Sequence, residues 1–245
     1  MQRIAVLASG GGTNLQALID HFHTGGNRAA TVALVVSDRE NAGALARARS
    51  AGIPSRVIAV KGRNVDDIAS DTLAAFTEHT IDVVALAGYL RLIPDAVVRR
   101  YRGRIVNVHP ALLPAFGGTG MYGMHVHRAV IESGCRVTGV TVHEVDERYD
   151  EGRAIVQWPV PVLRGDTAES LAVRVLRVEH VVYPLAVEAI ARRVPAGGAD
   201  ASAVPARTAS RAGFRGDDPA AFEWSTGEGI AAQVRRLLDI EGDMT

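Results

Sequence analysis

Short apolar segments alternate along the chain with segments whose apolar residues recur at helical spacing. The first kind predicts buried strands and the second predicts amphipathic helices, because side chains alternate across a strand but return to one face of a helix every three or four residues. Strands are predicted over residues 3–8, 31–37, 56–60, 81–87 and 105–108, and helices over residues 15–20, 42–51, 65–79, 96–101 and 167–190. The pattern is typical of an α/β protein with a Rossmann-like, mostly parallel twisted sheet and helices on both of its faces.

The C-terminal half departs from this regular order. Residues 136–145 alternate between apolar and polar side chains, and residues 154–158 form another apolar run after an acidic loop. Both patterns indicate strands. The fold is therefore expected to include an antiparallel strand in this half.

From Val194 onward the sequence becomes rich in alanine, glycine and proline, which is typical of a flexible linker. We therefore divide the chain into a main domain over residues 1–190 and a low-complexity linker with a short C-terminal tail over residues 191–245. Residues 227–240 of the tail predict a short helix. Its expected inward face consists of Ile230, Val234, Leu237 and Leu238, and Phe222 and Trp224 are expected to hold it down.

A polar pair lies at the end of the fifth predicted strand. Asn107 and His109 share one face of that strand, and Pro110 ends it because proline brings no amide hydrogen to a sheet. In open α/β sheets the ligand crevice lies at the carboxyl ends of the strands, where this pair falls. An amide can hydrogen-bond an oxygen that gains negative charge, and an imidazole can move a proton near neutral pH. Alternatively, an Asn and a His at a strand end simply satisfy backbone groups.

A glycine-rich turn with the sequence Ser-Gly-Gly-Gly-Thr-Asn over residues 9–14 joins the first strand to the first helix. Such a turn offers backbone N–H groups and the positive end of a helix to a phosphate, and glycine permits close approach. The glycine spacing differs from GxGxxG and no Gly-Lys-Ser/Thr is present, which disfavours a dinucleotide and a P-loop ligand. A tight turn with an Asn or Thr helix cap is the alternative.

Composition and charge narrow the classes of function. The 245 residues include 27 acidic and 27 basic side chains, so the formal net charge of zero gives no support to a nucleic-acid surface or a membrane anchor. The single cysteine, Cys135, excludes an intrachain disulfide and agrees with a cytoplasmic location. The apolar start of the chain is interrupted after Ala8, too early for a signal peptide, and no apolar run reaches the roughly eighteen residues of a membrane span.

Two of these segments resemble a known family. Residues 107–114 read Asn-Val-His-Pro-Ala-Leu-Leu-Pro and resemble the signature of the formyltransferases that use 10-formyltetrahydrofolate. The turn over residues 9–14 resembles the phosphate loop of those members that act on glycinamide ribonucleotide. Across residues 1–190, the resemblance implies transfer of a formyl group from the co-substrate 10-formyltetrahydrofolate to the amine of glycinamide ribonucleotide, a step of purine (IMP) synthesis. It also implies a phosphate-binding N-terminal half, a folate-binding C-terminal half and no metal ion.

The resemblance places three catalytic residues. Asn107 is expected to donate an N–H to the oxyanion of a tetrahedral intermediate, while a protonated His109 binds the same oxygen and supplies a proton to the leaving nitrogen. The family has a carboxylate seven residues beyond a strand histidine and two before a glycine, and that position is Asp150, between His143 and Gly152. A negative Asp150 near the imidazole is expected to raise the pKa of His109. His143 is expected to shape the pocket.

Two sets of binding residues follow from the same resemblance. The ribonucleotide phosphate is expected at Gly12, Thr13 and Asn14, and its ribose hydroxyls at Glu179, since a carboxylate accepts hydrogen bonds. The folate is expected between apolar side chains that sandwich the pterin ring and a loop that reads its polar edge. These folate-binding residues are Leu90, Arg91, Leu92, Ile93, Asn107, Asp146, Glu147, Arg148, Tyr149 and Asp150.

The segment over residues 115–124 is several residues longer than in many members of the family and contains four glycines. Mobile loops beside pockets often act as lids, so we expect a substrate-side flap whose Tyr122 touches the ligand. His125 and His127 follow, but two histidines at this spacing do not face each other on a helix, and no carboxylate or cysteine stands at a zinc-like spacing. We therefore expect packing or capping roles for both histidines.

Several functions stay open as alternatives: a formyltetrahydrofolate hydrolase, a formyltransferase for a sugar nucleotide or methionyl-tRNA, and a non-catalytic folate- or nucleotide-binding module. A tRNA-specific member usually carries an additional RNA-binding domain, and a hydrolase usually carries an N-terminal regulatory domain. The turn over residues 9–14 favours a small phosphorylated acceptor. The expected partners are therefore the two small-molecule substrates, without nucleic acid or membrane, and a homodimer stays open.

Overall fold

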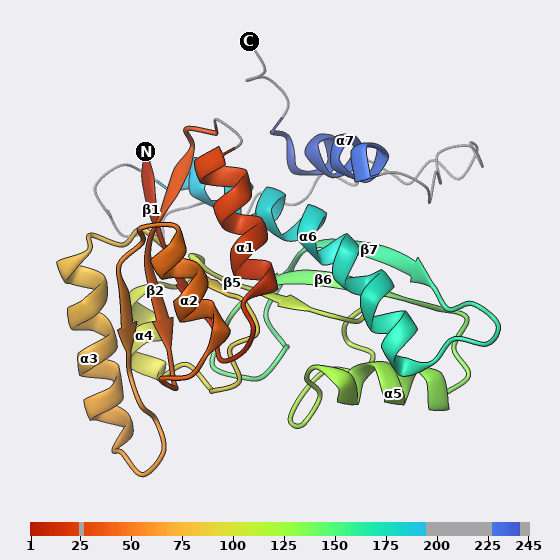
Figure 1. The fold of residues 1–245 in the computed structure, drawn as a ribbon, viewed down its shortest axis with the longest axis horizontal. Helices are drawn as coiled ribbons and strands as arrows, with labels where there is room; N and C mark the ends of the chain where they lie inside the picture. The colour runs from red at the N-terminus through yellow and green to blue at the C-terminus, as the bar shows by residue number, and fades with distance from the viewer. Residues whose placement is uncertain (25–26, 195–226, 241–245) are drawn as a thin grey trace.

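The computed structural model describes residues 1–24, 27–194 and 227–240. Its centre is a seven-stranded sheet in the order β3-β2-β1-β4-β5-β6-β7 (Figure 1). The strands are β1 (Gln2–Leu7), β2 (Ala30–Ser37), β3 (Ser55–Val57), β4 (Val83–Leu86), β5 (Ile105–His109), β6 (Val137–Glu144) and β7 (Ala154–Pro161). The first five run parallel, β6 is antiparallel to β5, and β7 is antiparallel to β6. The predicted mostly parallel sheet with an antiparallel strand in the C-terminal half is confirmed.

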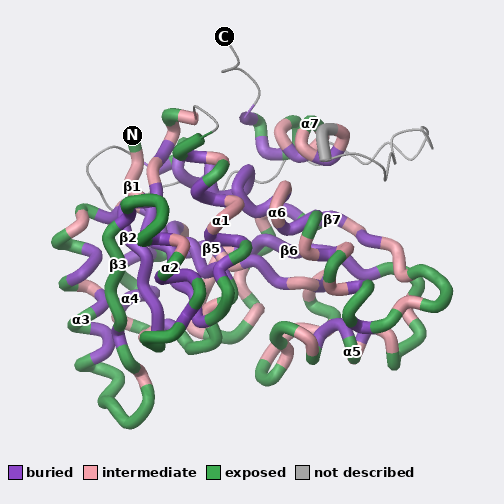
Figure 2. The backbone as a smooth tube through the Cα atoms, viewed as in Figure 1, coloured by how far each residue is buried: buried purple, intermediate pink, exposed green. Residues whose placement is uncertain are grey.

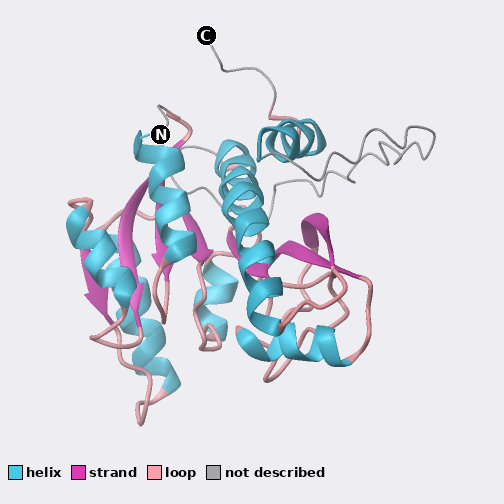
Figure 3. Ribbon diagram, turned by 45° about the vertical axis from the view of Figure 1, so that its right-hand side comes forward, coloured by secondary structure: helices cyan, strands magenta, loops and turns pink. Residues whose placement is uncertain are grey.

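Helices cover both faces of the sheet, as predicted (Figure 3). They are α1 (Thr13–Ile19), the π-helix η1 (Asp20–Thr24), α2 (Gly43–Ser50), α3 (Val65–Glu78), α4 (Asp95–Arg100), α5 (Met124–Glu132), α6 (Ala168–Arg193) and α7 (Gly227–Leu238). Side chains of α1, α2, α5, α6 and α7 share one buried apolar cluster, and those of α3 and α4 form a second cluster. Of these described helices, none is both long and apolar enough to cross a bilayer.

The ends of some elements differ from the prediction, because pairing with a neighbour decides where a strand stops. β3 is shorter than predicted, since β2 ends at Ser37, the partner of Val57. β7 continues past the predicted end at residue 158 to Pro161, which pairs with Val137 at the start of β6. α6 begins after Thr167, whose side chain caps it, and runs three residues beyond the predicted end at Ile190 to Arg193.

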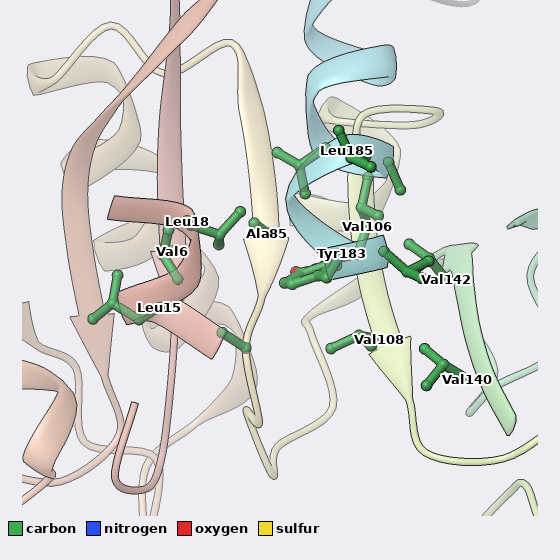
Figure 4. Close-up of a cluster of buried hydrophobic side chains, with 14 of the residues drawn as sticks. Val6, Leu15, Leu18, Ala85, Val106, Val108, Val140, Val142, Tyr183 and Leu185 are labelled. Carbon is green, nitrogen blue, oxygen red and sulfur yellow. The ribbon is translucent and has the colours of Figure 1, made fainter. Parts of the chain in front are cut away.

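A buried tyrosine joins the longest helix to the centre of the sheet. The hydroxyl of Tyr183 in α6 lies 2.8 Å from the carbonyl oxygen of Leu86 and 3.1 Å from that of Val106. Figure 4 shows this side chain among apolar residues of the neighbouring strands. β4 is buried along its whole length. β1 and β5 are buried along most of theirs (Figure 2). Tyr183 therefore fixes α6 over β4 and β5, the strands whose ends carry the candidate site.

The predicted tail helix is present as α7 and packs against α6. Its inward residues are Ile230, Val234 and Leu238, and Ile240 follows in the same apolar cluster. The prediction was wrong for Leu237, which is 57% exposed because it falls outside the stripe that those residues form on the helix. Phe222 and Trp224, expected to hold this helix down, lie outside the described residues. Residues 195–226 of the predicted linker and tail also lie outside them.

A tight contact at Gly152 holds the acidic loop against the end of β6. A Cβ atom at Gly152 would lie 1.8 Å from the carbonyl oxygen of Glu144. We expect Gly152→Ala to lower the free energy of unfolding by about 1–3 kcal/mol, because the loop that carries Asp150 must move away. Urea unfolding at pH 7 measures the effect, and Gly10→Ala is the control because a Cβ at Gly10 meets no atom within 4 Å. Equal stabilities of the two variants would contradict the prediction.

Candidate active site

A cavity of about 620 Å³ lies at the carboxyl ends of β4 and β5. This is the edge of the sheet at which Asn107 and His109 were predicted to lie. Its wall combines the ends of these strands with the loop before α5, the acidic loop after β6 and one side of α6. Residues from both halves of the chain thus meet in one place. The predicted residues Asn107, His109 and Asp150 all line this cavity, together with Asn14 and Glu179.

The antiparallel pairing of β5 with β6 sets Asn107 directly opposite His143. The amide nitrogen of Asn107 lies 3.1 Å from His143 Nε2, and His143 Nδ1 lies 2.8 Å from the carbonyl oxygen of Glu144. A carbonyl oxygen only accepts, so these contacts assign the proton of a neutral His143 to Nδ1, and its Nε2 accepts one N–H of Asn107. This leaves the second N–H of the amide to serve a ligand in the cavity, as an oxyanion donor requires.

The carboxylate of Asp150 faces both histidines of this cluster. Its Oδ2 lies 3.5 Å from His109 Nδ1 and accepts the backbone N–H of Gly118 at 3.0 Å, while its Oδ1 lies 3.6 Å from His143 Nε2. The other ring nitrogen of His109, Nε2, lies 2.8 Å from the carbonyl oxygen of Phe116. His109 therefore lies between an acceptor in the acidic loop and an acceptor in the glycine-rich loop.

Burial decides the charge of this pair. Burial lowers the pKa of His109, and the charge of Asp150 and the carbonyl of Phe116 oppose it only in part, so the net pKa lies below the usual value. As expected, the charge of Asp150 acts to raise the pKa of His109. The prediction of a raised pKa was nevertheless wrong, because desolvation is the larger effect and lowers it. Burial also raises the pKa of Asp150, but His143, His109 and Gly118 together outweigh it and hold that pKa below its usual value. Near neutral pH, a neutral imidazole thus lies beside a carboxylate.

A second polar pair lies in the same cavity. The amide N–H of Asn14 in α1 donates to the carboxylate of Glu179 in α6 at 2.6 Å, and both residues are buried. Within the described part of the chain, Asn14 Oδ1 is buried without a hydrogen-bond partner. Burial raises the pKa of Glu179 to about 7, and the hydrogen bond from Asn14 opposes this only in part. The pair therefore offers an ionisable acceptor and an unsatisfied acceptor to a ligand with hydroxyl groups.

The raised pKa of Glu179 makes stability depend on pH. Between the ordinary pKa of 4.5 and the folded pKa of about 7, the folded protein keeps a proton that the unfolded chain has released, so stability falls as pH rises through this window. We expect Glu179→Gln, which carries no such proton, to be more stable than wild type by about 1–3 kcal/mol at pH 8 and nearly equal at pH 5. Urea unfolding at both values tests this. A difference between the two proteins that does not change with pH would contradict a buried, titrating Glu179.

The three residues of the predicted phosphate loop do not share one surface. Asn14 lines the main cavity, whereas Thr13 lines a second cavity of about 560 Å³ together with Arg47 and His180. Gly12 lines neither of these cavities. It precedes α1 with a left-handed φ of 74°, and a Cβ there would lie 2.8 Å from the Cα of Ala44. Glycine is therefore required at this position by the packing of α1 against α2.

Most of the predicted folate-binding residues line the main cavity. They are Leu90, Arg91, Leu92, Ile93, Asn107, Asp146, Arg148, Tyr149 and Asp150. Glu147 does not belong to this wall, and its carboxylate pairs with the guanidinium of Arg102. Four of the five predicted residues of the acidic loop thus line the cavity, and Glu147 does not.

The wall also includes residues outside the predicted catalytic and binding sets. His127 of α5 is buried beside the cavity, and its Nδ1 has no hydrogen-bond partner among the described residues. Burial, and to a smaller extent the charge of His109, lowers the pKa of His127. Apolar wall is added by Met121, Met124, Ala172 and Leu176. Across residues 1–24, 27–194 and 227–240, no group of three or more His, Cys, Asp or Glu side chains could hold a metal ion.

The glycine-rich segment before α5 also contributes to the wall. Residues 118–124 line the cavity, and the Tyr122 ring lies edge-on to that of His125 with 5.3 Å between the ring centroids. Tyr122 is 49% exposed. Its contact with a ligand stays a prediction.

The fold and the cavity define a Rossmann-like α/β protein with a small-molecule site at the carboxyl edge of its sheet. Residues 2–187 match the family described as formyl transferase. The chain therefore belongs to the formyl transferase family.

Named relatives agree with this family. The chain is 45% identical over 194 residues to the chloroplastic phosphoribosylglycinamide formyltransferase of Vigna unguiculata, covering 77% of this chain and 61% of that protein. Its fold resembles glycinamide ribonucleotide transformylase 1 from Symbiobacterium toebii, with a TM-score of 0.72, 41% identity and coverage of 78% and 88% of the two chains. For phosphoribosylglycinamide formyltransferase from Brucella melitensis the TM-score is 0.71, with 42% identity and coverage of 78% and 95%. The chain spans less than two thirds of the length of the curated relatives it matches.

Proposed function

We propose that this chain transfers a formyl group from 10-formyltetrahydrofolate to the amine of glycinamide ribonucleotide, in the synthesis of purines. The observation that carries the proposal is the convergence of Asn107, His109 and Asp150 on one cavity that also contains Asn14 and Glu179. An oxyanion donor, a proton carrier and a carboxylate thus face the same space as a pair suited to a sugar. The names of the relatives support formyl transfer and the ribonucleotide acceptor. The folate donor rests on the family resemblance of residues 107–114.

We assign the two substrates to different groups of residues. Ribose hydroxyls can donate to the carboxylate of Glu179 and to Asn14 Oδ1, which satisfies the buried acceptor. The ribonucleotide phosphate is assigned to the turn that contains Gly12 and Thr13. The folate is assigned to the apolar segment over residues 90–93, whose side chains suit a flat ring.

The reaction then forms one bond, breaks one bond and moves one proton from the amine to the leaving nitrogen in two transfers. The substrate amine attacks the formyl carbon, and Asn107 donates its second N–H to the carbonyl oxygen as that oxygen becomes negative. A neutral His109 accepts the proton that the amine loses, and Asp150 stabilises the imidazolium. His109 returns this proton to the leaving folate nitrogen as its bond to the formyl carbon breaks. The resting state therefore differs from the protonated His109 expected from the sequence, because burial lowers its pKa.

A formyl-transfer assay with purified protein, 10-formyltetrahydrofolate and glycinamide ribonucleotide tests the proposal. We expect one formylated ribonucleotide for each tetrahydrofolate released, measured by chromatography. Release of tetrahydrofolate without an acceptor would instead identify a hydrolase, and formylation of a sugar nucleotide or methionyl-tRNA alone would identify a different transferase. Absence of both turnover and folate binding would overturn the proposal.

A further inference from the structure

A buried carboxylate outside the catalytic cluster lies where three strands of the sheet end. Asp38 directly follows β2, and its side chain is 1% exposed. A carboxylate at this depth is unfavourable unless hydrogen bonds and opposite charges replace the water that it loses. Asp38 obtains these contacts from Ser9, which follows β1, and from Arg91, which follows β4.

The contacts of Asp38 are specific. Arg91 Nε donates to Asp38 Oδ2 at 2.9 Å, and the hydroxyl of Ser9 hydrogen-bonds the same carboxylate. The guanidinium of Arg39 also lies 3.3 Å from Oδ2, and the side chains of Arg39 and Arg91 are both 42% exposed. Burial raises the pKa of Asp38, but the hydrogen bonds from Ser9, Arg91 and Arg39 outweigh it, so the pKa stays below its usual value and the group is ionised at pH 7.

Ser9 extends this contact to the wall of the main cavity. Its hydroxyl oxygen accepts the backbone N–H of Leu90 at 3.0 Å, and its own N–H donates to the carbonyl oxygen of Gly88 at 3.1 Å. Residues 88–93 line the cavity without interruption. The carboxylate of Asp38 therefore holds this segment twice, through the Arg91 side chain and, by way of Ser9, through the backbone at Leu90.

We propose that Asp38 and Ser9 are positioning residues for the folate, which fix the segment over residues 88–93 in the shape that receives the pterin ring. The inference rests on the proposed function, because it takes the ligand of this segment to be a folate. Neither side chain is part of the cavity wall, so both act through Leu90 and Arg91. The ribonucleotide end, at Asn14 and Glu179, keeps its own hydrogen bond.

The test compares substrate constants in Ser9→Ala, Asp38→Ala and Asp38→Asn. We expect Ser9→Ala and Asp38→Ala to raise the KM for 10-formyltetrahydrofolate and the Kd for tetrahydrofolate roughly tenfold. A tenfold change corresponds to the free energy of about one hydrogen bond to a charged group. Asp38→Asn keeps an acceptor oxygen of the same shape and should lie between wild type and Asp38→Ala. The KM for the ribonucleotide should change less than about twofold in all three variants.

A double variant separates a connected pair from two independent residues. Ser9→Ala combined with Asp38→Ala should raise the folate constants little more than either change alone, because both break the same chain of contacts. Arg39→Ala is the matched control, since it removes a guanidinium from Asp38 without touching residues 88–93. It should leave the folate constants within about twofold of wild type.

Other outcomes overturn the inference. One is that the KM and Kd for the folate stay unchanged in the alanine variants. Another is that the two changes add up in the double variant. The third is an equal rise in the KM for both substrates together with a lower melting temperature, which would indicate a general loss of structure. Calorimetry with tetrahydrofolate alone distinguishes this failure from that of the proposed function. Wild-type protein that binds tetrahydrofolate without formylating the ribonucleotide contradicts the proposed acceptor, while the Kd values of the variants still decide the roles of Asp38 and Ser9.

Discussion

Replacement of His109 by alanine is expected to lower kcat for formyl transfer by about 10²–10⁴-fold, the usual contribution of a positioned proton carrier. The imidazole lines the cavity 3.5 Å from Asp150, and alanine leaves no group there that accepts or donates a proton. The Kd for the ribonucleotide should stay within about threefold of wild type, because the bond between Asn14 and Glu179 is untouched. Steady-state kinetics measure the first quantity, and calorimetry with the ribonucleotide alone measures the second.

His79→Ala is the matched control for this variant. His79 follows α3 and does not line the cavity, so its loss should leave kcat and the ribonucleotide Kd unchanged. A His109→Ala protein whose ribonucleotide affinity falls as much as its kcat would identify His109 as a structural residue.

The parallel strands could be predicted because burial on both faces demands short apolar runs, and β1 and β4 are such runs. Other features depend on contacts between distant residues. The π-helix after α1 is one example, since its His21 hydrogen-bonds Glu188 of α6 at 2.8 Å, 167 positions later. The end of β7 is another, because it depends on pairing with β6. Neither contact can be predicted from the pattern of neighbouring residues in the sequence.

The candidate site also combines features that could be predicted from local sequence with features that depend on contacts between distant residues. Asn107 and His109 could be placed together because alternation along one strand puts them on one face. The bond between Asn107 and His143 instead requires the register of β5 against β6, which no local pattern fixes. The position of the Asp150 carboxylate requires a left-handed φ of 57° and the close approach of Gly152 to β6, so only the family resemblance indicated it. The pKa of His109 was predicted in the wrong direction because the sequence gives the charged neighbour but not the depth of burial.

Replacement of Asp150 by asparagine is expected to lower kcat by more than about 10²-fold and to move the pH dependence of the remaining activity toward lower pH. Asparagine has nearly the same shape and also tolerates a left-handed backbone, so the variant removes the charge while keeping the φ of 57°. Its side-chain oxygen can still accept the N–H of Gly118. The loss therefore reports on the charge of the carboxylate.

The direction of the pH shift follows from the groups around His109. Burial lowers the pKa of His109 and the charge of Asp150 opposes it, so removal of that charge lowers the pKa further. Because neutral His109 accepts the proton of the amine in the proposed reaction, the rate rises as pH rises through this pKa. In Asp150→Asn the rise should occur at lower pH and reach a lower plateau. Rates between pH 5 and 8 at saturating substrates measure both changes.

Glu151→Gln is the control for the charge of this loop. Glu151 is the neighbouring carboxylate, pairs with Arg148 at 2.6 Å and does not line the cavity. Its replacement should leave both the plateau and the midpoint of the pH profile at their wild-type values. A low plateau in Asp150→Asn with an unchanged midpoint would mean that the carboxylate does not act on the charge of His109.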